Sequence, residues 1–230
     1  MKIGKRYRNA LEGYNSSQNH SLNDAVELLK KMPKTNFDET VELSIHLGVD
    51  SRQSDQMVRG VVDLPNGSGK KVRVIVFTDD PETALEAGAD YAGKDDIIKK
   101  IQEGWLEFDV AISVPKAMKE VRTIARILGP RGLMPNPKSG TVSDDIEGAV
   151  KAITQGGRVE YKMDKQANIG VVVGKRSFSP EQLSENINSV FDSIGQVKPE
   201  GIKDKYILSA TLSGTMSPGI KLEPAEYSKY

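Results

Sequence analysis

The side chains that could do chemistry in this sequence are of a restricted kind. Cysteine is absent and histidine occurs twice, at His20 and His46. Thiolate nucleophiles, disulfides and histidine-rich metal sites are therefore excluded. Hydroxyl, carboxylate and lysine side chains remain, and many of them recur at every second position of segments that alternate with apolar residues.

Two patterns resemble catalytic motifs but do not meet their requirements. The Gly-rich run 65–71 lacks the Gly and the Ser/Thr that a phosphate loop needs, since Leu64 and Lys71 stand there, and it precedes a strand instead of following one. His46 shares a strand face with Glu42 and Ser44, but a trio along one strand spreads over more than ~10 Å, which is not triad geometry. No enzymatic activity is predicted.

Three acidic pairs, 79–80, 95–96 and 144–145, stand at expected helix starts, where carboxylates stabilise the helix dipole. We interpret them as capping groups, not metal ligands, and expect no cofactor.

The charge balance is neutral, with 32 basic and 32 acidic residues, so any nucleic-acid site must be a local arrangement of groups. No apolar run approaches the ~20 residues of a membrane span. The first eight residues lack the apolar core of a signal peptide. These features predict a soluble, cytoplasmic protein without a membrane partner.

Half-buried strands and amphipathic helices occupy both ends of the chain. Residues 41–49, 158–164 and 206–213 alternate apolar with polar side chains, and the last run places Leu208 on the apolar face. Helices are expected after the caps Ser21 and Ser179, and residues 1–20 are expected to be a solvated basic arm. This combination is typical of an α+β domain.

The middle of the chain has a different pattern. Apolar runs at 72–77 and 110–114 predict strands buried on both faces, as in a parallel sheet. Helices are expected from Pro81, over 95–103 and from Pro115 to about 126, with a short link at 90–91 and a last helix capped by Ser143. Strand–helix alternation of this kind predicts an α/β domain with a parallel, Rossmann-like sheet.

The fold prediction is therefore an α+β split domain, residues 1–68 and 157–230, with an α/β domain inserted at 69–156. The chain crosses between them through Gly-rich segments at 65–69 and 155–157. Paired Gly-rich crossings suit a hinge, because Gly absorbs large backbone changes, but two tight turns explain them equally well.

The segment 128–142 is a further candidate site. Three Pro and three Gly in its fifteen residues exclude a helix or central strand. The basic side chains of Arg131 and Lys138 project from what we expect to be a rigid loop.

This loop resembles the signature of the L-one family, the large-subunit ribosomal proteins of the mobile E-site stalk. The resemblance continues, in the family's order and spacing, through residues 5–7, 34–41, 54–60, 86–91, 104–105 and 215–219. It implies a non-enzymatic ribonucleoprotein component, monomeric within the ribosome, that binds large-subunit rRNA. It also implies assistance in release of deacylated tRNA from the E site and repression of translation through the protein's own mRNA leader.

The resemblance further implies an rRNA-binding face on the split domain. Carried onto the matching positions, that face comprises Lys34, Phe37, Thr40, Glu42, Lys162, Asp164, Lys165, Ser209, Thr211, Thr215, Met216 and Ser217. Hydroxyl and carboxylate groups suit 2′-hydroxyls, and lysines suit phosphates. Phe37 fits a ribose or base, or equally a place in the core. Arg131 and Lys138 are possible tRNA or rRNA contacts.

Two positions depart from the family. Ser217 stands where the family has Gly, so we expect either strain at a positive φ or a different turn. The family commonly has His near Gly170, and no side-chain contact is expected from this glycine. Two alternatives compete with this prediction. A nucleotide-dependent enzyme using the α/β domain is disfavoured by the missing phosphate loop, and a protein that closes around a small molecule at the hinge is permitted by the Gly-rich crossings. Neither explains the loop 128–142 or the hydroxyl-rich strand face.

Overall fold

The structure, a computed structural model, describes residues 4–12, 14–15, 17–154, 157–199, 202 and 205–229, and of Ser54, Lys138 and Ala152 it describes the backbone alone. The chain forms two compact units. The split unit contains Met1–Gly69 and Val159–Tyr230, and the α/β unit contains Lys70–Arg158.

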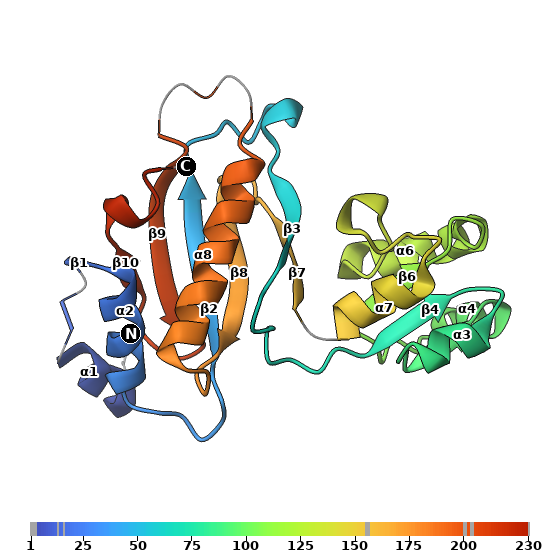
Figure 1. The fold of residues 1–230 in the computed structure, drawn as a ribbon, viewed down its shortest axis with the longest axis horizontal. Helices are drawn as coiled ribbons and strands as arrows, with labels where there is room; N and C mark the ends of the chain where they lie inside the picture. The colour runs from blue at the N-terminus through green and yellow to red at the C-terminus, as the bar shows by residue number, and fades with distance from the viewer. Residues whose placement is uncertain are drawn as a thin grey trace. The chain divides into compact units, whose positions relative to one another are not determined.

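A five-stranded sheet is the centre of the split unit (Figure 1). Its order is β1 (Asn19–His20), β10 (Ile220–Leu222), β9 (Ile207–Gly214), β2 (Thr40–Leu47) and β8 (Asn168–Lys175). β2 pairs antiparallel with both β8 and β9. A separate two-stranded sheet joins β3 (Arg59–Asp63) to β7 (Arg158–Lys162).

Two helices bury the apolar face of this sheet. α2 (Leu22–Lys31) and α8 (Pro180–Gln196) begin at the expected caps: the Ser21 hydroxyl accepts a hydrogen bond from the amide of Asp24, and Ser179 and Gln182 form a reciprocal capping box. Apolar side chains spaced one helical turn apart on both helices join Val41, Leu43, Ile45 and Leu47 of β2 in one core. The opposite face of the sheet is left polar.

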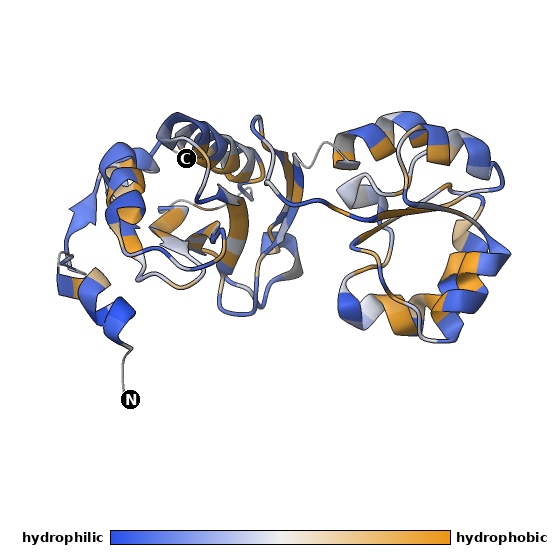
Figure 2. Cartoon of the chain, turned by 90° about the horizontal axis from the view of Figure 1, so that it is seen from below, coloured by the Kyte–Doolittle hydropathy of each residue, from blue (hydrophilic) through white to orange (hydrophobic). Residues whose placement is uncertain are grey.

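The α/β unit has a parallel three-stranded sheet with helices on both faces (Figure 2). Its order is β5 (Tyr91–Gly93), β4 (Val74–Phe77), β6 (Val110–Ser113). Ile75 and Phe77 face a core built with α4 (Asp95–Gln102), α5 (Met118–Val121) and α6 (Ala125–Leu128). Val74 and Val76 face another core with α3 (Pro81–Glu86) and α7 (Ile146–Thr154). This confirms the expected parallel sheet.

Several local expectations were wrong. Residues 5–12 form helix α1 (Lys5–Glu12), whose Ala10 joins the core, so the described part of this segment is not a free arm. Residues 91–93 form the edge strand β5, not a link. The expected helix from Pro115 starts at Met118 and is broken by a 3-10 turn, η2 (Arg122–Ile124). Asp145, not Ser143, receives the amide of Gly148 at the start of α7.

Leu208 is exposed, although strict alternation placed it on the apolar face. His46 pairs with Ser209 while Leu47 pairs with Ile207, so Leu208 is an extra residue in β9. A β-bulge of this kind reverses the facing of the residues beyond it.

The first crossing between the units contains two left-handed glycines, Gly67 (φ 70°) and Gly69 (φ 68°). The amide of Asn66 donates to the side chain of Asn186 on α8, at 3.1 Å. In the second crossing, residues 155 and 156 lie outside the described part of the chain.

Candidate nucleic-acid interface

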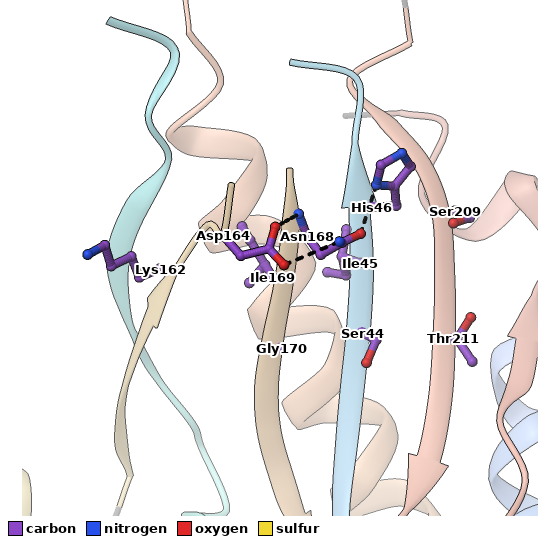
Figure 3. Close-up of a pocket in the computed structure, with 10 residues that line it drawn as sticks. All are labelled: Ser44, Ile45, His46, Lys162, Asp164, Asn168, Ile169, Gly170, Ser209 and Thr211. Atoms are coloured by element: carbon purple, nitrogen blue, oxygen red, sulfur yellow. Dashed lines mark hydrogen bonds between the residues drawn. The ribbon is translucent and has the colours of Figure 1, made fainter. Parts of the chain in front are cut away.

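The outward side chains of β8, β2 and β9 form a continuous polar surface, here called the open face. The pairing register of β2 with β8 and β9 determines which side chains are neighbours. Ser44 lies between Gly170 and Thr211, and His46 lies between Asn168 and Ser209. Figure 3 looks onto this face, with the helix that covers the opposite face lying behind the strands. Because successive strand residues alternate between faces, the apolar positions that α2 and α8 bury determine which polar groups point outward.

A chain of hydrogen bonds crosses the open face at the carboxyl end of β2 (Figure 3). His46 Nδ1 lies 2.8 Å from Asn168 Oδ1, and Asn168 Nδ2 donates to Asp164 Oδ2 at 3.3 Å. The amides of Gln166 and Asn168 both donate to Asp164 Oδ1 at 2.8 Å. These donors, the Asn168 amide first, lower the pKa of Asp164, and this carboxyl group stays ionised at neutral pH.

A hollow of about 400 Å³ lies above this chain of hydrogen bonds, lined from β2, β7, β8 and β9 by the residues drawn in Figure 3. Its floor is Gly170, where an added Cβ would meet no atom within 4 Å. A glycine in a strand often marks the place where another backbone approaches closely. The hollow therefore combines hydroxyl, amide, imidazole and carboxylate groups around an unobstructed patch of backbone.

The other end of β2 is closed by hydroxyl groups. Thr215 Oγ1 accepts from the Thr40 amide at 3.1 Å and lies 3.2 Å from the Thr40 carbonyl oxygen. Ser217 Oγ accepts from the Gly214 amide at 2.7 Å. Ser217 is not among the described residues with positive φ, so the turn differs from one that requires glycine, and no strain arises there.

Two basic side chains missed by the sequence prediction reach this turn. Lys175 Nζ donates to Thr40 Oγ1 at 2.9 Å. Arg6 of α1 donates to the Met216 carbonyl oxygen at 2.9 Å and pairs with the Glu39 carboxylate at 3.5 Å. Residue type alone gives no signal for either contact, because both depend on segments far apart in the sequence.

The predicted rRNA-binding residues fall into two groups joined by the open face. One group lies at the amino end of β2 or in the loops beside it and contains Lys34, Phe37, Thr40, Thr215, Met216 and Ser217. The other lies toward the carboxyl end of β2 and contains Lys162, Asp164, Lys165 and Ser209. Glu42 and Thr211 lie between the groups. Thr40 and His46 lie six residue steps apart along the strand, roughly 20 Å. Phe37 is 54% exposed, which excludes the core alternative.

Ser44, His46 and Asn168 belong to the same surface and were not predicted as contacts. The alternation of residues 41–49 already placed Ser44 and His46 on the polar face, so a signal for both existed. Asn168 had none, since its role depends on the turn at Asp164.

The loop 128–142 lies in the α/β unit and is ordered by its own polar contacts. The Asn136 amide donates to Thr141 Oγ1 at 2.8 Å, and the Ser113 amide donates to the Thr141 carbonyl oxygen at 2.9 Å. Arg131 is exposed at the end of a 3-10 turn, η3 (Gly129–Arg131). The side chain of Lys138 lies outside the described part of the structure.

Among the described residues, no group of three His, Cys, Asp or Glu side chains could hold a metal ion. In the same part of the chain, no helix has the length and apolar character needed to cross a membrane.

Comparison with known proteins identifies the family. The profile of the Ribosomal protein L1p/L10e family matches residues 29–218. The chain belongs to this family. It is 45% identical over 227 residues to the large ribosomal subunit protein uL1 of Bifidobacterium adolescentis, covering 98% of each chain. The protein of the same name from Chlamydia pneumoniae is 45% identical over 227 residues, covering 98% of this chain and 97% of its own.

A third family member, the large ribosomal subunit protein uL1 of Clavibacter michiganensis, is 48% identical over 225 residues, covering 97% of this chain and 98% of its own. The L1p/L10e profile begins within α2 and ends just after the Thr215–Ser217 turn. It therefore includes both groups of predicted contact residues together with the whole α/β unit. The resemblance inferred from separated sequence blocks is confirmed.

Proposed function

We propose that this protein is a non-enzymatic component of the large ribosomal subunit whose split unit, residues 1–68 and 157–230, binds rRNA through the open face. The observation that carries the proposal is the open face itself: three adjacent strands expose hydroxyl, carboxylate, amide and imidazole groups while α2 and α8 bury the other side. The names of the family's relatives, large ribosomal subunit proteins, support the same assignment.

The chemistry of the open face suits folded RNA. Proteins recognise RNA through its shape, its phosphates and its 2′-hydroxyls, and hydroxyl and carboxylate groups such as Ser44, Thr211 and Glu42 are partners for 2′-hydroxyls. Lys34, Lys162 and Lys165 enter no ion pair within the described residues, so their ammonium groups are available to phosphates. Recognition by many neutral groups and few cations is compatible with a net charge of zero.

The test is binding of the purified protein to a large-subunit rRNA fragment carrying the stalk junction, against a scrambled RNA of equal length, across a salt series. We expect preference for the junction at physiological salt, with a shallow salt dependence that reflects few phosphate contacts. Thr211→Val, which removes one hydroxyl from the open face, should weaken junction binding. Thr123→Val, which removes an exposed hydroxyl from the α/β unit, is its control. Equal and steeply salt-sensitive binding to both RNAs contradicts the proposal.

Within the subunit, we propose that the protein forms the mobile stalk that assists release of deacylated tRNA from the E site. The exposed Arg131, carried on a loop fixed by Asn136 and Thr141, supports a tRNA or rRNA contact by the α/β unit. Lys138, on the same loop, is the second candidate. Ribosomes carrying Arg131→Ala and Lys138→Ala together should release E-site tRNA at an altered rate, and unchanged kinetics would remove this role.

We also propose that the same open face binds the protein's own mRNA leader and represses its translation. This proposal rests on the family resemblance and on the simplicity of one surface that binds both rRNA and the mRNA leader. Leader RNA should compete with the rRNA junction for the protein, and Thr211→Val should weaken both complexes together. Leader binding that survives saturation with junction RNA contradicts a shared site.

A further inference from the structure

Met57 is an exposed apolar side chain beside a second hollow of the split unit. Its side chain is 45% exposed, and the hollow, about 450 Å³, is here called the Met57 pocket. It is lined by Ser51, Met57, Lys162, Met163, Asp164 and Lys165. Lys162 and Asp164 also line the hollow on the open face, so the two hollows share a rim.

The Met57 pocket is held by specific contacts. Ser51 Oγ donates to the Lys165 carbonyl oxygen at 2.5 Å, and the Met163 amide donates to the Val58 carbonyl oxygen at 2.9 Å. The Asp50 amide donates to Gln56 Oε1 at 2.8 Å. The segment around Met57 is thus tied to the strand end at Met163, whose own side chain is buried. Met57 is therefore exposed on a segment that hydrogen bonds hold in place.

The charges on the rim favour an anion beside the apolar floor. Neither Lys162 nor Lys165 enters an ion pair within the described residues. The nearby carboxylate of Asp164 is already occupied by two backbone amides and the Asn168 side chain. Two lysines that enter no ion pair within the described residues therefore line the same hollow as Met57, and with the ionised Asp164 the formal charge of these rim residues is +1.

We propose that the Met57 pocket receives one unstacked nucleobase of the RNA bound on the open face, with its phosphate held by Lys162 and Lys165. A flat aromatic group attached to an anion matches both halves of the surface, since methionine sulfur makes favourable contacts with aromatic rings and lysine binds phosphate. The volume lies within the ~300–1,000 Å³ of small-ligand pockets. The inference rests on the proposed rRNA binding and extends it to a residue with no assigned role.

The test combines abasic nucleotides with substitution of Met57 in the full-length protein. Each unpaired nucleotide of the junction RNA is replaced in turn by an abasic one, and its affinity is measured for wild type and Met57→Ala. We expect one abasic position to weaken wild-type binding roughly tenfold, as for a stacked base. The same position should cost Met57→Ala almost nothing, because the base has already lost its partner.

Two further variants make the outcome decisive. Met57→Leu, similar in volume, should retain most of the sensitivity to that abasic position. Leu85→Ala, at an equally exposed apolar residue of the α/β unit, should bind every RNA as wild type does. If wild type binds the junction but no abasic position couples to Met57, the pocket inference is overturned and the proposed function stands. Failure of wild type to prefer the junction overturns both. Capture of an aromatic peptide by this pocket in place of RNA would also overturn it.

Discussion

The carboxylate of Glu39 and the guanidinium of Arg176 form an ion pair in which neither side chain is more than 7% exposed. Arg176 also donates to the carbonyl oxygens of Lys30 and Met32 at the end of α2. The Arg176 amide donates to the Glu39 carbonyl oxygen at 2.8 Å. One buried pair therefore fixes α2, the loop that carries Lys34 and Phe37, and the end of β8.

Replacing Glu39 by Gln should destabilise the split unit strongly. The substitution leaves the Arg176 charge buried without its counter-ion, and breaking such pairs costs about 3–5 kcal/mol. Chemical denaturation followed by circular dichroism measures the loss. Glu27→Gln, which breaks an exposed pair with Lys31, is the control and should change the free energy of unfolding by less than ~0.5 kcal/mol. Equal losses in the free energy of unfolding for the two variants would show that burial does not determine how strongly an ion pair stabilises the fold.

Ser179→Ala should cost about 1 kcal/mol, because it removes the acceptor for the Gln182 amide at the first turn of α8. Ser189→Ala, within the same helix, is the matched variant. Its hydroxyl bonds only a helical carbonyl, so the better helix propensity of Ala should make this change neutral or slightly stabilising. The stabilities of the two variants are compared by thermal unfolding. A larger loss of stability for Ser189→Ala than for Ser179→Ala would contradict the capping role.

Gly170→Ala should preserve folding and impair RNA binding. An added methyl meets no protein atom and sits at an ordinary strand φ, so the melting temperature should hold or rise. The methyl would occupy the floor of the hollow on the open face, and we expect affinity for the junction RNA to fall about tenfold or more, equivalent to ~1.4 kcal/mol.

Gly129→Ala is the matched control for Gly170→Ala, because an added Cβ also meets no atom there, its φ is −57°, and it lies in the α/β unit. Its RNA affinity should equal that of wild type. Unchanged affinity for Gly170→Ala would mean that RNA does not approach the strand at this point.

Acidification should destabilise the turn at Asp164. Hydrogen bonds from the Asn168 and Gln166 amides lower the pKa of this carboxyl group in the folded state. Its contribution to stability is complete above the unfolded pKa of ~3.9 and is lost as pH falls toward the folded pKa. A carboxyl-detected NMR titration should give an Asp164 pKa below ~3.9. Asp164→Asn should lose less stability than wild type on acidification through this range, and a pKa at or above ~3.9 would refute the argument.

Much of the fold could be predicted because it depends on interactions between residues close together in the sequence. The caps at Ser21 and Ser179 and the alternation of β2 each depend on neighbours within a few residues, and they are confirmed. The buried run predicted at 72–77 is confirmed over 74–77, where the strand lies. The open face follows from the same alternation, because burying Leu43 and Ile45 leaves Ser44 and His46 outward.

The predictions that failed depended on distant partners. Leu208 points outward because it is an extra residue in β9 that has no pairing partner in β2. This bulge depends on the register between two strands that are far apart in the sequence. Helix α1 is fixed by Arg6, which donates to the Glu39 carboxylate and to the Met216 carbonyl oxygen. Ser143 and Asp145 are both residue types that cap helices: Ser143 Oγ accepts from the Asp145 amide, and Asp145 accepts from the Gly148 amide at the start of α7.

The split unit also sets an order of events during synthesis. β2 lies between β8 and β9, yet both partners come from the chain beyond Arg158. When residue 158 has been made, the α/β unit is complete, while β2 has no neighbouring strand. At ~5–20 residues per second, residues 159–230 take roughly 4–14 s to appear. During that interval the apolar side of β2, with Val41, Leu43 and Ile45, has no cover from α8. Transiently exposed apolar surface of this kind is prone to aggregation and is what chaperones bind.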